Sequence, residues 1–71
     1  MKKSKIQIQF GDLFVHYKQP NDMFYIKGMN QQETEFMVGW FANTNRHCFY
    51  SEFTLKGWIN KGVYHYYPVI P

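Results

Sequence analysis

The sequence predicts one small, mostly β domain, and three observations carry this prediction. The 71 residues include 7 Phe, 6 Tyr and 2 Trp, and such aromatic side chains favour strands. Leucine occurs only twice and alanine once, so the best helix formers are scarce. Short apolar segments alternate with turn-forming residues, which is typical of a small sandwich or barrel. We expect a single domain: a basic tail at residues 1–5, then the folded part at residues 6–71.

Two strands are predicted near the start of the chain. Residues 6–10 alternate apolar and polar side chains, as a half-buried strand does, and they end at Gly11. Residues 13–17 form the next apolar segment, which stops at a polar turn cluster that contains Pro20.

Three more strands are predicted in the middle of the chain. Residues 23–29 are followed by the polar run at 30–34, and residues 35–42 then form a long apolar stretch. A turn rich in asparagine precedes the segment at residues 47–53.

Residues 54–62 break the strand pattern, because their apolar side chains recur at helical spacing. Thr54 is expected to cap the start, and Gly62 to take the left-handed position after the end. Since Gly57 weakens a longer α-helix, we expect only a short helical or 3₁₀ turn. A last strand then covers residues 63–70, where Pro68 indicates an edge position or a strand end.

This order of elements resembles the SH3-like small β-barrels, which have about five antiparallel strands and a short helical turn before the last one. The resemblance is carried by the Gly11-Asp12 opening and by residues 54–62, which lead into residues 64–68. It implies a closed small barrel. It does not imply polyproline binding, because the sequence lacks the acidic specificity loop of the peptide-binding SH3 domains.

Strand alternation predicts which side chains form the core. The expected core residues are Leu13, Val15, Tyr17, Phe24, Ile26, Phe36, Val38, Trp40, Phe49, Phe53, Leu55 and Ile59. Large apolar side chains nevertheless also fall on the opposite strand faces, namely Phe14, Tyr25, Met29, Met37, Phe41 and Tyr50. This excess predicts an exposed binding patch. The alternative is a β-bulge around Gly28 or Gly39, which would exchange the two faces.

The leading functional hypothesis is a non-enzymatic binding module that contacts a protein partner through aromatic side chains. The predicted protein-binding residues are Tyr25, Met37, Phe41, Tyr50, Tyr64, Tyr66 and Tyr67. Frequent Phe, Tyr, Ile, Met, Asn and Lys residues are typical of AT-rich genes, as in low-GC bacteria and their phages. We therefore add the hypothesis of a phage-type accessory protein or a host-directed inhibitor.

Two alternatives remain open. A small barrel can bind single-stranded or duplex nucleic acid by stacking bases on aromatic side chains while lysines follow the backbone. The lysines available for this are Lys2, Lys3, Lys5, Lys18 and Lys27. The net charge of +3 comes from the first five residues, since five cationic and five anionic side chains follow, and this counts against nucleic acid. Unpaired edge strands also allow a homo-oligomer.

No residue pattern in the sequence indicates an enzyme, a cofactor or a metal site. His16, His47, His65 and Cys48 show no metal-ligand spacing, and Ser51 stands in no nucleophile motif. A single cysteine cannot form an intrachain disulfide, which favours a reducing compartment and therefore the cytoplasm. The sequence also predicts no signal peptide and no membrane span.

Overall fold

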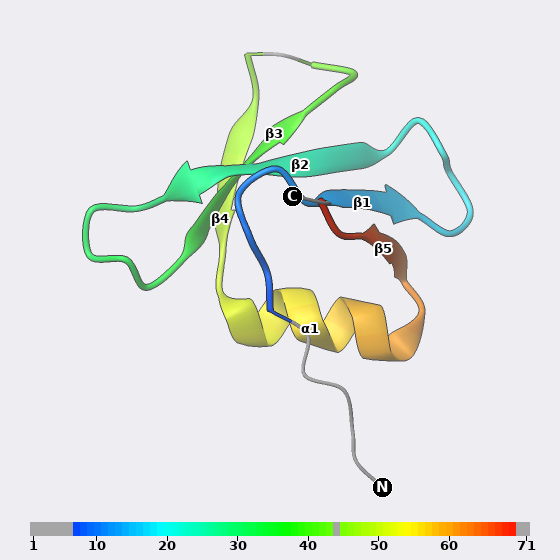
Figure 1. Ribbon diagram of the computed structural model, residues 1–71. Helices are drawn as coiled ribbons and strands as arrows, with labels where there is room; N and C mark the ends of the chain where they lie inside the picture. Colours follow the sequence, from blue (N-terminus) through cyan, green and yellow to red (C-terminus); the bar gives the residue numbers. More distant parts are fainter. Residues whose placement is uncertain (1–6, 44, 70–71) are drawn as a thin grey trace, which may run out of the picture.

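The computed structural model describes residues 7–43 and 45–69, which form five strands and one helix (Figure 1). The strands are β1 (Leu13–His16), β2 (Met23–Met29), β3 (Phe36–Trp40), β4 (His47–Tyr50) and β5 (Tyr64–Tyr67). Helix α1 (Glu52–Lys61) lies between β4 and β5 in the chain. The strands form one antiparallel sheet in the order β4-β3-β2-β1-β5, so α1 connects the two edge strands.

This architecture confirms the prediction of a mostly β domain with about five antiparallel strands and a helix before the last one. Within the described residues no pairing joins the edge strands β4 and β5, so the sheet is open and the predicted barrel closure is not observed. Residues 7–10, which were expected to form a strand, are irregular. The predicted basic tail at residues 1–5 lies outside the described residues.

Helix α1 is longer than the sequence predicts, with ten residues instead of a single turn. Its N-cap is Ser51, not Thr54, because the Ser51 side chain accepts a hydrogen bond from the Thr54 N–H. Gly62 ends the helix as predicted, since its φ of 77° lies in the left-handed region that glycine adopts without strain. The predicted strand at residues 47–53 therefore stops at Tyr50, where this cap begins.

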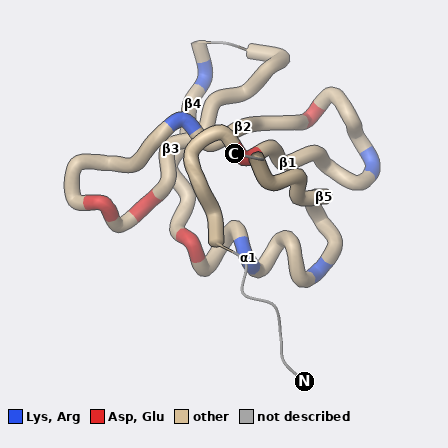
Figure 2. Tube along the Cα trace, viewed as in Figure 1, with Lys and Arg blue, Asp and Glu red and all other residues tan. Residues whose placement is uncertain are grey.

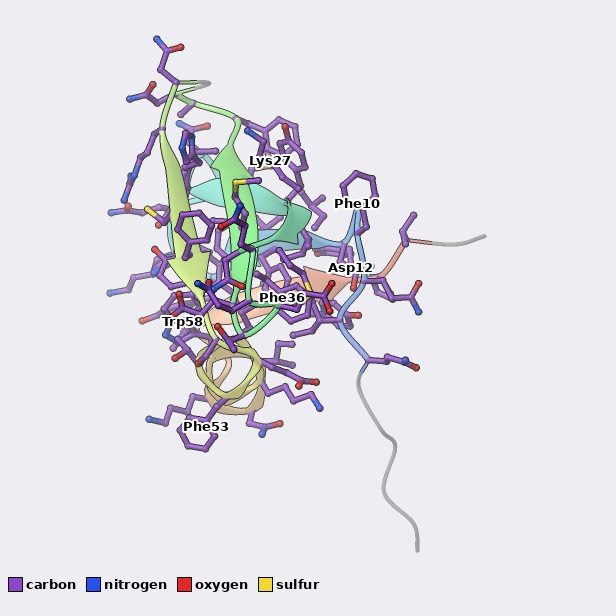
Figure 3. All side chains as sticks on the ribbon, turned by 90° about the vertical axis from the view of Figure 1, so that its left-hand side faces the viewer. Phe10, Asp12, Lys27, Phe36, Phe53 and Trp58 are labelled. Carbon is purple, nitrogen blue, oxygen red and sulfur yellow. The ribbon has the colours of Figure 1, made fainter. Side chains whose placement is uncertain are left out.

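The core lies between α1 and one face of the sheet (Figure 1). The buried apolar residues are Ile8, Phe14, Phe24, Ile26, Val38, Trp40, Leu55 and Tyr64. Phe14 and Phe24 lie opposite each other on β1 and β2, with stacked rings 4.9 Å apart. Trp58 of α1 packs against Phe24, and Figure 3 shows it between the helix and the strands. Aromatic side chains thus make up four of the eight buried apolar residues of this small core.

Two parts of the predicted core assignment are wrong. Phe14 is fully buried, whereas Tyr17 is exposed, because β1 turns its even-numbered side chains toward α1. The sequence did not distinguish these faces, since residues 13–15 are apolar without interruption. Phe49 and Phe53 were also expected in the core, but both are exposed. Phe53 is 87% exposed, on the outer side of α1.

A register shift lies between Ile26 and Gly28, where β2 pairs with β3. Val38 pairs with Ile26 and Met37 pairs with Gly28, so Lys27 is the extra residue of a bulge. The irregularity lies at one of the two glycine positions where the sequence predicted it.

Asp12 is the one buried charged residue among those described, with 1% of its surface exposed. Its carboxylate accepts hydrogen bonds from the Gln9 N–H at 2.8 Å, the Tyr66 hydroxyl at 2.6 Å and the Val69 N–H at 2.8 Å. These donors come from the segment before β1, from β5 and from the segment after β5. The carboxylate therefore joins three segments at one edge of the core.

Ionisation of two tyrosines of β5 should lower the stability of the domain at alkaline pH. Burial and the Asp12 carboxylate raise the pKa of Tyr66 above its ordinary value, and burial together with Asp22 raises the pKa of Tyr64. Stability from these neutral phenols is complete below about pH 10, where tyrosine ionises in an unfolded chain, and is lost as the pH rises further. Urea unfolding at about pH 9 and about pH 11 should show this loss. Tyr66→Phe should make this loss of stability smaller. The same loss in Tyr66→Phe and wild type would show that ionisation of Tyr66 does not contribute to it.

Candidate functional site

The sheet face opposite α1, which we call the open face, carries a second set of large side chains. Strand register places its members, because side chains alternate between the two faces. The open face consists of Leu13, Val15, Met23, Tyr25, Lys27, Met37, Gly39, Phe41, His47, Phe49, His65 and Tyr67. The single helix of the described residues lies on the other side of the sheet, so no helix covers this face (Figure 1).

A pocket of about 350 Å³ lies on the open face. Its walls include Tyr25 and Phe41, whose ring centroids are 5.2 Å apart, and the side chain of Lys27. Gly39 is buried beneath these side chains. A side chain would not fit at this position, because a Cβ would come within 2.6 Å of Lys27 Cδ and 3.1 Å of Tyr25 Cε1. The absence of a side chain in β3 therefore lets a tyrosine and a lysine lie across the strand.

The open face carries a lysine and two histidines, and none of its described residues is acidic. Lys27 is part of the pocket wall, and His47 and His65 lie on the outer strands β4 and β5. The described acidic side chains lie in loops, in α1 or on the α1 side of the sheet. Figure 2 shows the described lysines and arginine spread over the trace, without a basic cluster.

The structure brings four of the predicted protein-binding residues together on the open face: Tyr25, Met37, Phe41 and Tyr67. The three others lie on the α1 side. Tyr64 belongs to the core, Tyr66 donates to Asp12, and Tyr50 packs against Trp58 with ring centroids 4.9 Å apart. These three tyrosines are held by the fold and are not part of the open face.

The structure describes two of the predicted nucleic-acid-binding lysines, Lys18 and Lys27, and these two lie in different parts of the fold. Lys18 lies in the exposed turn between β1 and β2, with its Nζ 6.0 Å from the centroid of the Tyr17 ring. Lys27 lies in the pocket of the open face. Lys2, Lys3 and Lys5 fall outside the described residues.

Sequence reasoning missed several members of the open face. Leu13, Val15 and Phe49 were assigned to the core, while Met23, His47 and His65 were not placed on this face at all. The sequence does not show which alternate side chains of β1 and β4 face α1, that is, the phase of these two strands. Only cross-strand pairs such as Phe14 with Phe24, and Val38 with Cys48, fix that phase.

The comparisons with known proteins found no matching family model, no matching curated protein and no matching solved structure. Among the described residues, no helix has the length and apolar character needed to span a membrane. In the same part of the chain, no three His, Cys, Asp or Glu side chains come together in a way that would hold a metal ion.

Proposed function

We propose that this chain is a non-enzymatic binding module that contacts a protein partner through its open face. The observation that carries this proposal is the exposure of large apolar side chains on a sheet face without a covering helix: Phe41 is 50% exposed, Phe49 45% and Tyr67 54%. Exposed apolar patches of this kind mark interaction sites on small proteins. Tyr25 and Phe41 are the expected anchors, since aromatic side chains beside a pocket supply much of the energy of interfaces.

Charge defines the kind of partner that fits. The open face offers Lys27 beside its aromatic pocket and two histidines on the outer strands, with no carboxylate among its described members. A complementary protein surface would insert an apolar side chain into the pocket beside the packed rings of Tyr25 and Phe41 and would carry acidic residues around it. Lys27 would attract the acidic residues of such a surface, and these residues would face no carboxylate on the open face.

Nucleic acid is the second candidate, favoured by the position of Lys27 next to two aromatic rings. A base could stack on Tyr25 or Phe41 while the lysine contacts a phosphate. The scattered charges shown in Figure 2 support this candidate less than they support a protein partner. Salt distinguishes the two, because nucleic-acid affinity falls steeply between about 50 and 200 mM salt, whereas a mainly apolar interface responds weakly.

Phe41→Ala should abolish capture of the partner without unfolding the domain. The side chain is half exposed, so its loss affects binding more than packing. We expect the Kd to increase about 10-fold or more, the effect of removing an interface anchor. A pull-down with the tagged chain from nuclease-treated and untreated lysate identifies the captured species, and calorimetry with the purified species measures the Kd.

Phe53→Ala is the matched control, because Phe53 is the same residue type, exposed on the outer side of α1, away from the sheet (Figure 3). This variant should capture the partner as the wild type does. Equal capture by Phe41→Ala and wild type would contradict the proposal. Capture that disappears with nuclease would replace the protein partner with nucleic acid. A concentration-dependent dimer that Phe41→Ala dissociates would identify the partner as a second copy.

A further inference from the structure

The hydrogen-bond pattern of β3 shows which backbone groups of the edge strand β4 are free. The Phe41 N–H donates to the Met23 carbonyl of β2 at 3.3 Å, so Phe41 directs its backbone groups toward β2. This direction alternates along an antiparallel strand, and Val38, three residues earlier, therefore directs its N–H and C=O toward β4. Val38 pairs with Cys48. Cys48 thus directs its own backbone groups toward β3, whereas the residues on either side of it direct theirs outward.

The outward-directed groups belong to His47 and Phe49, which are both exposed. Among the described residues, no backbone group outside the sheet donates to them or accepts from them. Strand β4 contains neither proline nor lysine and pairs with β3 without a bulge, so it lacks three of the features that protect sheet edges. The other edge strand, β5, is followed directly by Pro68. The edge of β4 is therefore the one that can accept a further strand.

A second copy of β4 fits this edge. When the strand pairs antiparallel with its own copy about Phe49, the two Phe49 residues lie opposite each other, and the N–H of each donates to the C=O of the other. Side chains that lie opposite each other point to the same side of a sheet, so the two Phe49 rings lie side by side on the side of the open face. The two five-stranded sheets then continue into each other.

Charge complementarity favours this register. Arg46 and Glu52 each lie three residues from Phe49, so the pairing places Arg46 of each copy opposite Glu52 of the other. Arg46 is exposed and forms no ion pair among the described residues. The Glu52 carboxylate lies 3.0 Å from Lys56 Nζ, and the Glu52 side chain is 54% exposed, so the carboxylate can accept further hydrogen bonds. The neighbouring register, which places Arg46 opposite Tyr50, gives no such ion pair.

We propose that two copies of this chain form a symmetric homodimer by antiparallel pairing of their β4 edges, with Phe49 at the two-fold axis and an Arg46–Glu52 ion pair on each side of it. The two open faces then lie on the same side of the joined sheet. This inference does not rest on the proposed binding function, because the backbone edge of β4 is separate from the pocket beside Tyr25 and Phe41.

The first test is sedimentation equilibrium of the full chain at concentrations up to about 1 mM, where we expect a reversible dimer with a Kd between about 1 μM and 1 mM. Phe49→Pro should abolish the dimer, because it removes the N–H at the two-fold axis. The monomer keeps its fold, since proline is tolerated where a strand edge faces solvent. Phe49→Ala is the matched control: it also loses the ring but keeps the N–H, so the Kd should increase by only about 5-fold or less. Circular dichroism verifies the fold of both variants.

The second test exchanges the charges of the ion pair. Arg46→Glu places two carboxylates opposite each other and should increase the Kd by about 10-fold or more. The double variant Arg46→Glu with Glu52→Arg should recover most of this loss, and Phe41→Ala should dimerise as the wild type does.

Four results would overturn the proposal. A wild-type chain that stays monomeric up to about 1 mM would leave the β4 edge to a strand of another protein. Equal dimerisation of Phe49→Pro and Phe49→Ala would exclude backbone pairing at Phe49. No recovery in the charge-exchanged double variant would exclude this register. Dissociation by Phe41→Ala would place the dimer interface on the open face instead of the edge.

Discussion

Replacing Phe24 with alanine should leave much of the protein unfolded, whereas replacing Phe53 should leave its stability nearly unchanged. Phe24 is fully buried at the centre of the sheet, and its ring lies 4.8 Å from that of Trp40 and 5.1 Å from that of Tyr64. Removal of a buried phenylalanine side chain costs about 3–5 kcal/mol of stability, because a cavity remains. A domain of this size has a total stability in the lower part of the usual range of about 5–15 kcal/mol.

The measurement is urea unfolding followed by circular dichroism, with Phe24→Ala and Phe53→Ala compared under the same conditions. Both variants make the same chemical change, so intrinsic effects of removing a phenyl ring are matched. Phe53 is 87% exposed, and a substitution at such a surface position changes stability by about 0.5 kcal/mol or less. A difference of less than about 1 kcal/mol between the two variants would show that Phe24 is not central to the core.

Asp12→Ala should be the most damaging change to a polar residue. The carboxylate of Asp12 accepts three hydrogen bonds, and the substitution would leave the donors of Gln9, Tyr66 and Val69 without this acceptor. Each hydrogen bond to a charged group contributes about 1.5–3 kcal/mol, and donors that regain water offset part of the loss. We expect the free energy of unfolding to fall by about 3 kcal/mol.

Two further variants separate the contributions at this carboxylate. Tyr66→Phe removes one donor and should cost about 1–2 kcal/mol. Asp12→Asn keeps one acceptor oxygen and should fall between wild type and Asp12→Ala. In the double variant Asp12→Ala with Tyr66→Phe, the effect of Tyr66→Phe should nearly vanish, as expected for groups that act on each other. Additive effects in chemical unfolding would contradict a direct bond between these residues.

Much of the fold could be predicted from local patterns in the sequence. Turn residues mark the boundaries of β2 and β3, and Gly62 marks the end of α1. The start of α1 was placed too late because Ser51 and Thr54 are both good caps, and only the hydrogen bond from the Thr54 N–H to Ser51 distinguishes them. Whether the sheet closes into a barrel depends on its overall curvature, which local sequence patterns do not predict.

The candidate site was predicted in part for a related reason. Tyr25, Met37 and Phe41 were assigned to the correct face because the phase expected for β2 and β3, with Phe24, Ile26, Phe36, Val38 and Trp40 toward the core, is the one that the structure has. Alternation fails in β5, where tyrosines occupy both faces, and it could not separate the buried Tyr64 from the exposed Tyr67. The hydrogen bond from Tyr66 to Asp12 joins positions 54 residues apart, so no pattern of neighbouring residues in the sequence could predict it.

The placement of β5 at the edge next to β1 has a consequence for how the chain acquires its structure. Strands β1 to β4 are joined by successive hairpins, whose contacts are local and form quickly. Strand β5 must instead return across the sheet through α1, and its hydrogen bonds with β1 close a loop of roughly 50 residues, which is slow to form. We therefore expect the docking of α1 and β5 to be the slow, cooperative step of folding, since it completes the core and brings the Asp12 donors into place together.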